Sequence, residues 1–482
     1  MPRNLRILAG GLSAASTFRT TLTWKQFPIA ATLARTILHA SGGCLLGAVF
    51  MLPQLLAAQN PIPLVNQPLI PASVALGGPG FTLSVRGTGF VPGARVRWNG
   101  APRPTAFVSS SQLNADIRAS DVAFSTAASI TVSNPSTGPS NVVNFPVTDA
   151  ISSFTFKGSW VATPGNSNGI TVGDFNGDGK EDIAILNRFI DLVSVLLSVG
   201  DGSFLPRVDY TAYSSSQGTT PLTSGDVNGD GKLDLITIGS VLLGNGDGTF
   251  QGPIAYPGRP DAQAVQAADV NGDGKLDVVT ANISGTVSVW LGNGDGTLQT
   301  AMVFGRNVGS YDLTIGDFNG DGKLDVATAG GSSVYVLLGN GDGTLQNPQN
   351  LHVGQFALGI ACADFNRDGI LDLVATSDTD FPESSELAFF QGNGDGTFKK
   401  EKTTELSTFA DGYSLNVADL NGDGNLDIVA GLDYSQSSVF FGNGDGTFQF
   451  QAQLTGGFLT AVGSFNGDGR LDATTLGPNT IS

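Results

Sequence analysis

One nine-residue pattern, Asp-x-Asn-x-Asp-Gly-x-x-Asp, occurs seven times and fills the later part of the chain. We number its positions 1 to 9 and call each copy a loop, first to seventh. Consecutive loops start 43 to 55 residues apart. A chain that repeats one motif at such a period folds as an array of similar units rather than around one irregular core. The loops begin at Asp174, Asp226, Asp269, Asp317, Asp364, Asp419 and, with serine at position 1, Ser464.

The residue types in these loops indicate a cation site. Oxygen-bearing side chains occupy positions 1, 3, 5 and 9, and glycine at position 6 lets the backbone turn back. Calcium accepts six to eight oxygens at about 2.3–2.6 Å with irregular geometry, whereas magnesium demands a tighter octahedron. We therefore expect Ca²⁺ at six strong sites and at one weak site, the seventh, which lacks its first carboxylate. The expected metal ligands are Asp174, Asn176, Asp178 and Asp182; Asp226, Asn228, Asp230 and Asp234; Asp269, Asn271, Asp273 and Asp277; Asp317, Asn319, Asp321 and Asp325; Asp364, Asn366, Asp368 and Asp372; Asp419, Asn421, Asp423 and Asp427; and Asn466, Asp468 and Asp472.

The residues around the loops predict strands. Position 12, a bidentate Glu in an EF-hand, holds Ile, Thr or Ala in every copy. Short β-branched apolar runs follow each loop, such as residues 277–281 and 287–291. A second motif, Gly-Asn-Gly-Asp-Gly-Thr-Phe/Leu, keeps phase with the loops and supplies the positive φ angles of a tight hairpin. Each repeat therefore reads as strand, loop, strand, strand, hairpin, strand, which has the period of a β-propeller blade.

These motifs resemble the FG-GAP/VCBS repeat family of calcium-loop propellers, which is also seen in integrin α-subunit heads and some fungal lectins. The resemblance implies an all-β fold in which residues 150–482 form a seven-bladed β-propeller. The last blade looks incomplete, because too few residues follow Leu476 for a full third strand. Residues 154–163 resemble the segment that follows a hairpin, so we expect them to complete the seventh blade and close the ring.

The region before the repeats divides in two. Residues 1–59 contain basic but no acidic residues and end in a short apolar stretch, which predicts a secretory signal and a secreted or cell-surface protein. No later stretch has the roughly 18 apolar residues of a membrane span. Residues 61–149 alternate apolar and polar residues between turn signals, which predicts a small β-sandwich. Residues 87–100 resemble the immunoglobulin-like IPT/TIG domain of bacterial surface proteins.

Composition and motifs argue against catalysis and nucleic-acid binding. The chain has 42 Asp and Glu against 24 Lys and Arg, an acidity unsuited to nucleic acids. His352 is the only histidine after residue 59, and no nucleophile elbow, zinc motif or phosphate loop is present. We expect a non-catalytic module for recognition or adhesion, with a glycan or protein ligand. The alternatives are a purely structural calcium-rigidified module and a polysaccharide-degrading enzyme.

Four aromatic residues beside glycines are candidates for ligand binding. In propellers of this family, the connections that enter the innermost strands emerge opposite the calcium loops, where aromatic rings can stack on sugars. The same rings can instead pack between blades. For the loops, the alternative is a series of Asx turns that bind no metal. The candidate aromatic residues are Tyr311, Phe356, Tyr413 and Phe458.

Overall fold

The structure is a computed structural model of the chain that describes seventeen stretches of it. Residues 1–59 lie outside this description, and so does the predicted leader. Among the described residues, no helix has the length and apolar character needed to cross a membrane. The described stretches are 60, 63–66, 68–124, 126–149, 161–162, 167–187, 189–213, 222–258, 261–309, 311–354, 356–380, 383–406, 412–432, 436–455, 457–468, 470–476 and 480–481.

The described part is almost entirely β, as the sequence predicts: its one helix is the short 3-10 helix η1 (Ala119–Val122). Strands between residues 64 and 147 form two four-stranded antiparallel sheets. Alternate residues of both sheets pack into one core around Trp98 and Phe145, whose rings lie 5.4 Å apart. One sheet contains β1 (Leu64–Val65), β2 (Phe81–Thr88), β6 (Gln112–Ile117) and β5 (Thr105–Ser109), and the other contains β4 (Ala101–Pro102), β3 (Arg95–Trp98), β7 (Thr126–Ser133) and β8 (Val143–Val147).

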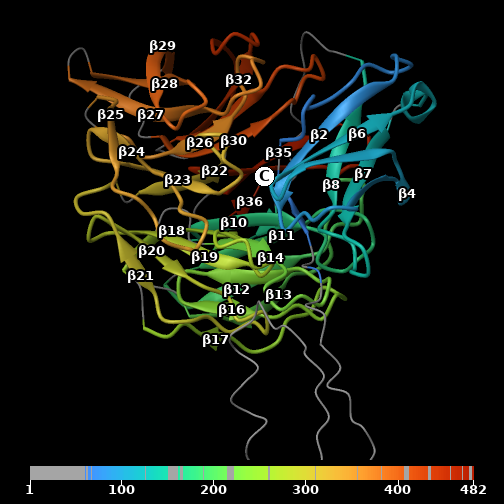
Figure 1. Cartoon of the computed structure of the whole chain (residues 1–482), viewed down its shortest axis with the longest axis horizontal. Coiled ribbons are helices and arrows are strands. Elements are labelled where there is room, and N and C mark those ends of the chain that lie inside the picture. The colour runs from blue at the N-terminus through green and yellow to red at the C-terminus, as the bar shows by residue number, and fades with distance from the viewer. Residues whose placement is uncertain are drawn as a thin grey trace, which may run out of the picture. The chain divides into compact units, whose positions relative to one another are not determined.

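The repeat region forms seven further four-stranded antiparallel sheets, called here the first to seventh repeat sheets (Figure 1). The first four contain β10 (Gly169–Gly173), β11 (Asp182–Asn187), β12 (Leu192–Leu196) and β13 (Val208–Thr211); β14 (Leu222–Gly225), β15 (Asp234–Thr237), β16 (Ser240–Leu242) and β17 (Ile254–Ala255); β18 (Ala262–Ala268), β19 (Asp277–Asn282), β20 (Thr286–Trp290) and β21 (Met302–Phe304); and β22 (Asp312–Gly316), β23 (Asp325–Gly330), β24 (Ser333–Leu337) and β25 (Gln349–His352). The last three contain β26 (Ile360–Ala363), β27 (Asp372–Asp380), β28 (Glu383–Gly392) and β29 (Phe398–Leu406); β30 (Gly412–Ala418), β31 (Asp427–Leu432), β32 (Gln436–Gly442) and β33 (Phe448–Thr455); and β34 (Leu459–Gly463), β35 (Asp472–Leu476), β36 (Thr480–Ile481) and β9 (Val161–Ala162).

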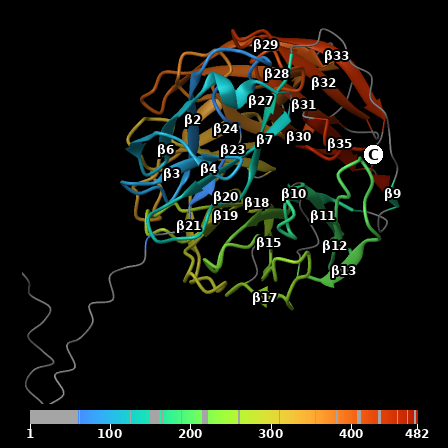
Figure 2. The same cartoon turned by 90° about the vertical axis from the view of Figure 1, so that its right-hand side faces the viewer.

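The predicted order within a repeat is confirmed. Each nine-residue loop joins the first and second strands of its sheet, and the aspartate at position 9 opens the second strand in all seven sheets. In the first six sheets the glycine-rich hairpin joins the third and fourth strands. Figure 2 shows the last strands β13, β17, β29 and β33 toward the rim of the repeat region.

Adjacent repeat sheets pack face to face, as in a β-propeller. First strands contact each other in chain order, from β10 to β34, and β34 also contacts β10. Apolar side chains fill the space between neighbouring sheets; between the seventh and first sheets they include Ile183, Leu459 and Ile481. Trp290 lies in the core between the second and third sheets.

The prediction of an incomplete last blade is wrong. β36 is a third strand of only two residues, and it holds because Leu476 pairs with Ile481, whose side chain is buried. β9 supplies the fourth strand, with Thr480 opposite Ala162. β9 lies inside the predicted closing segment 154–163, so the predicted pairing of this segment with the seventh sheet is confirmed for residues 161 and 162. Residues 154–160 and 163 lie outside the described residues.

Candidate metal centre

The loops turn back at glycines in the left-handed backbone region. In the first loop Gly177 has φ 74° and Gly179 has φ 83°. Side chains other than glycine reach this region at a cost of roughly 1–2 kcal/mol. In the fifth loop Arg367 replaces the glycine at position 4 and adopts φ 65°, so it accepts the same turn at that cost.

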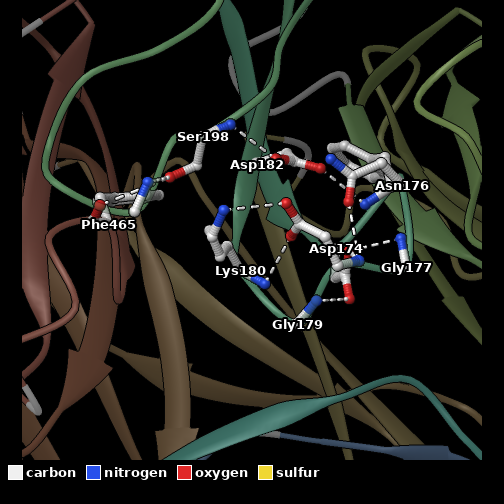
Figure 3. A network of polar contacts seen from close by, with 11 residues as sticks. Asp174, Asn176, Gly177, Gly179, Lys180, Asp182, Ser198 and Phe465 are labelled. Carbon is white, nitrogen blue, oxygen red and sulfur yellow. Dashed lines mark hydrogen bonds and ion pairs between the residues drawn. The ribbon is translucent and has the colours of Figure 1, made fainter.

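The carboxylate at position 1 holds each complete loop in shape, and Figure 3 shows these bonds in the first loop. Asp174 Oδ1 accepts the backbone N–H of Asp178 at 3.1 Å, and Oδ2 accepts that of Gly179 at 2.8 Å. Equivalent bonds to positions 5 and 6 occur in all six complete loops. The amide oxygen of Asn176 also accepts the N–H of Asp178, at 2.9 Å. The local structure is therefore a chain of Asx turns.

The aspartate at position 9 ties the loop to the glycine-rich hairpin. Asp182 Oδ2 accepts the N–H of Phe175 at 3.0 Å, and Oδ1 accepts that of Ser198, where the hairpin begins, at 2.8 Å (Figure 3). The five following repeats form the same pair of bonds. Sequence reasoning assigned this residue only as a ligand and missed its role as a clamp. The constant phase of the two motifs is the signal that could have shown it.

The position-9 carboxylates are buried close to other carboxylates. Burial raises the pKa of Asp182 to about 6, and repulsion from Asp174 and Asp178 adds to the rise. The same causes act on the equivalent residues, although hydrogen bonds from backbone N–H groups oppose them. The raised pKa values are about 7 for Asp234, Asp277, Asp325 and Asp372, and about 8 for Asp427.

The donor set fits a hard cation in its chemistry. Three carboxylates and one amide within nine residues supply oxygen ligands, and their mutual repulsion is what a cation relieves. A carboxylate has about four lone-pair positions, so the two N–H bonds to Asp182 do not exhaust it. Within the described ranges, no group of three or more His, Cys, Asp or Glu side chains is arranged to hold a metal ion as it stands. Calcium binding would require the loop side chains to converge further.

The seventh loop is built differently. Ser464 has no carboxylate for the amides of positions 5 and 6, and Asn466 instead donates its amide N–H to Asp472 at 2.8 Å. Asp472 still accepts the N–H of Phe465, at 2.9 Å, but within the described residues it accepts no N–H from a glycine-rich hairpin. Asp468 lies at the exposed tip.

The sixth loop lies deepest, and sequence reasoning gave no sign of this. Asp419 and Asn421 are buried, whereas Asp174 and Asn176 of the first loop are partly exposed. The Ser73 hydroxyl, which precedes β2, donates a hydrogen bond to Asp419 Oδ2. A residue more than 300 positions away therefore helps to orient this carboxylate.

The four candidate aromatic residues lie where the chain enters first strands, at the ends opposite the loops. Tyr413 and Phe458 form an edge-to-face pair with ring centroids 6.3 Å apart. Phe458 also packs on the core between the seventh and first sheets. Tyr311 is partly buried, whereas the side chain of Phe356 is 50% exposed. Only one of the four rings therefore presents a large free surface.

The glycine-rich hairpins are turns closed by their own side chains. In the second repeat, Asp247 Oδ1 accepts the N–H and the hydroxyl of Thr249 at 3.0 and 2.5 Å. These bonds lower the pKa of Asp247, opposite to the shift at position 9. These aspartates are exposed and accept hydrogen bonds from within their own hairpin, so their role is to stabilise the turn.

The clamp at position 9 should be more important for stability than the turn aspartates. Asp325→Ala leaves the buried N–H groups of Phe318 and Gly339 without an acceptor. We expect a loss of about 2–4 kcal/mol in the free energy of unfolding, measured by urea denaturation in calcium. The matched control is Asp342→Ala in the exposed hairpin of the same sheet, and it should have a much smaller effect. Equal losses would contradict the clamp.

The raised pKa values predict that the calcium-free protein is more stable at acidic than at slightly alkaline pH. A group with a folded-state pKa above its ordinary value stabilises the fold most at low pH, and this contribution is lost as pH rises through the folded-state pKa. With folded values of about 6 to 8 against an ordinary 3.8, the calcium-free protein should melt at a higher temperature at pH 5 than at pH 8. Protein stripped on a chelating resin and scanned at both values tests this. A higher melting temperature at pH 8 would contradict it.

Comparison with known proteins agrees with this architecture of repeated β-sheets and loops. The chain belongs to the FG-GAP-like repeat family, whose model matches residues 174–237, 239–280, 269–328, 317–375, 364–430 and 419–474. A comparison with curated proteins gave no match.

Solved structures with a similar fold come from several organisms. An Agrocybe aegerita lectin that recognises non-reducing terminal N-acetylglucosamine is 21% identical, over 74% of this chain and 94% of the lectin, with a TM-score of 0.43. A functionally unknown protein from Desulfotomaculum acetoxidans is 12% identical over 72% of this chain and 96% of its own, with a TM-score of 0.42. The V. cholerae biofilm matrix protein Bap1 is 19% identical over 62% of this chain and 42% of Bap1, with a TM-score of 0.30. At these values, no ligand or activity carries over.

Proposed function

We propose that this protein is a calcium-stabilised, non-catalytic recognition module exported to the cell surface or medium. The observation that carries the calcium proposal is the position-9 aspartate. Six times it is buried beside two further carboxylates of its own loop, an arrangement that repulsion disfavours and a cation would favour. Oxygen-only donors on a flexible loop suit calcium better than magnesium.

Positions 1, 3, 5 and 9 would hold the ion in each complete loop. Bound calcium supplies positive charge that offsets the repulsion between the carboxylates. The protein contributes the turn that brings them together and the N–H donors that orient them. The position-9 carboxylate also accepts a hydrogen bond from the glycine-rich hairpin. Calcium binding would therefore stiffen both the loop and the hairpin at one end of each sheet.

We further propose that the seven repeat sheets are the blades of one closed ring, preceded by an immunoglobulin-like domain of the IPT/TIG type. The contact between β34 and β10 supports the ring. A second support is a repeated bond between sheets. The hairpin N–H of Gly248 donates to the carbonyl oxygen of Phe175 in the preceding loop at 2.9 Å, and the N–H of Gly202 donates to Phe465 of the seventh loop at 3.0 Å. The contact between the seventh and first sheets therefore contains the same hydrogen bond as the contact between the first and second sheets.

For the ligand we favour a glycan or an extended protein segment that meets the sheet ends opposite the loops. Phe356 supports this choice because an exposed ring beside a glycine-rich connection can stack on a sugar face. The alternatives are a purely structural module and a polysaccharide-degrading enzyme. A glycan array on calcium-loaded protein separates them: a saturable signal that Phe356→Ser abolishes supports recognition, whereas silence favours the structural module and product release favours the enzyme.

The test of calcium binding is stoichiometry. Native mass spectrometry and calorimetric titration of the mature protein should show at least six bound calcium ions, with little competition from magnesium. Asp321→Asn should remove one ion, and Asp342→Asn in the neighbouring hairpin should remove none. A protein that stays calcium-free at millimolar calcium would refute the proposal.

A further inference from the structure

A cavity lies along the first strands of the repeat sheets. All seven first strands, from β10 to β34, contribute to its lining, and its volume is about 440 Å³. Residues around β1 and around the start of β8 line the same cavity, and these strands belong to the two sheets that precede the repeats. The cavity is therefore enclosed by both parts of the fold.

Hydrogen bonds hold the preceding sheets against the loop ends of the repeat sheets. The side chain of Asn141 accepts the backbone N–H of Val65 at 2.7 Å and donates to its carbonyl oxygen at 2.9 Å, which joins the two segments that line the cavity. Arg86 in β2 donates to the carbonyl oxygen of Gly369 in the fifth loop at 3.1 Å. The bond from Ser73 to the sixth loop adds a further contact. These contacts close the cavity at the loop ends.

The other end of the cavity lies where the first strands begin, opposite the loops. A smaller cavity of about 180 Å³ there shares part of its lining with the larger one, including Thr223, Gln266 and Asn416, which are partly exposed. Asp312 and Leu459, which open β22 and β34, also line it. Among the described residues, none before β10 lines this smaller cavity. The preceding sheets therefore leave this approach free.

The lining offers hydrogen-bond acceptors in fixed positions and no positive charge. Gln266 donates its amide N–H to the carbonyl oxygen of Leu313 at 2.9 Å. Asn416 donates its amide N–H to the carbonyl oxygen of Thr460 at 2.6 Å. In the described part of the chain, neither side-chain carbonyl oxygen accepts a hydrogen bond, so both remain as acceptors. No described Lys, Arg or His lines either cavity, and Asp312 is the charged residue of the smaller one.

We propose that the two cavities form one blind pocket, which takes the terminal sugar of an uncharged glycan from the end opposite the loops. This inference rests on the proposed recognition function and names the ligand class of the same face. A pocket closed at one end accepts the end of a chain rather than its middle. Sugar hydroxyls can donate to the amide oxygens, and the apolar side chains of Leu415 and Ile360 can contact the C–H groups of the ring.

The charge of the lining excludes acidic ligands. A uronic acid, a sialic acid or a peptide carboxyl terminus would bring a negative charge beside Asp312. Without a basic side chain in the lining, that charge would lose its water and gain no partner. The pocket therefore distinguishes neutral from acidic chain ends.

The test fills the pocket and measures sugar binding by calcium-loaded mature protein. The probes are methyl glycosides of neutral hexoses and of glucuronic acid, measured by saturation-transfer NMR and calorimetric titration. At least one neutral glycoside should bind, and the glucuronide should not. Thr223→Phe, which places a ring in the cavity, should abolish binding. Gln266→Met removes one acceptor and should weaken binding about tenfold. The matched control is Thr82→Phe on the exposed side of β2, which should bind like the wild-type protein.

The outcomes separate the pocket from the wider recognition function. Full binding by Thr223→Phe together with loss in Phe356→Ser would overturn the pocket and leave recognition by the exposed ring intact. Equal binding of the glucuronide, or no bound probe beside a positive glycan array, would also overturn the pocket alone. No signal with any probe or glycan would overturn both. Melting curves show whether each variant is folded; if Thr223→Phe is not, unchanged affinity in folded Gln266→Met overturns the pocket.

Discussion

Chelation of calcium should lower the melting temperature of the mature protein by more than about 10 °C. Each ion that binds only the folded state stabilises it by RT ln(1 + [L]/Kd), about 2.7 kcal/mol at a hundredfold excess over Kd. For large domains, 1 kcal/mol shifts the melting temperature by roughly 2–4 °C. Two saturated loops would already account for the predicted shift, and six complete loops are present.

The measurement is differential scanning calorimetry in excess calcium and after removal of calcium. Restoring calcium should recover the transition, and magnesium at the same concentration should recover little of it because it fits such loops poorly. Limited proteolysis should show faster cleavage of the calcium-free protein. A melting curve that does not change on chelation would show that the Asx turns and the packing between sheets stabilise the fold without calcium.

Disruption of β9 should destabilise the repeat region far more than disruption of an ordinary outer strand. The double change Val161→Pro and Ala162→Pro removes the backbone N–H groups that pair with β36. The seventh sheet then loses its fourth strand and leaves β36 as an open edge. We expect a lower melting temperature and aggregates in size-exclusion chromatography.

The matched control is Ile254→Pro with Ala255→Pro in β17, which is also a two-residue fourth strand. Its loss leaves the joint between last and first sheets intact, so the cost should be about 1–3 kcal/mol, the value of a few backbone hydrogen bonds. The β9 variant should lose at least twice as much. Equal losses would show that the packing around Ile183 and Leu459 closes the array without help from β9.

Local features of the repeats could be predicted from the sequence because they depend on residues close together in the chain. The loop motif fixes a turn through its own aspartates and glycines, and the alternating runs after it fix the strands. Trp290 is in a core because it lies within such a run, and Trp98 in β3 is in the core of the two sheets that precede the repeats. The candidate metal-ligating residues of the six complete loops also share one loop conformation, because their positions are fixed by the motif itself.

Features that depend on distant residues could not be predicted in this way. The contacts of Ser73 with Asp419 and of Arg86 with Gly369 leave no periodic signal. The short strand β36 was missed because its two residues are stabilised by burial of Ile481 rather than by strand length.

The pairing of β9 with β36 also constrains the order in which the chain can fold. β9 is made before any repeat, yet its partner lies more than 300 residues later. Earlier repeat sheets can form during synthesis, because each uses strands that follow one another directly. The seventh cannot, because its strand β9 precedes the six other repeat sheets and its strand β36 follows them. Until residue 481 emerges from the ribosome, β9 has no partner, and the growing array has two open faces. The pairing of β9 with β36 is therefore a late step in the folding of the repeat region.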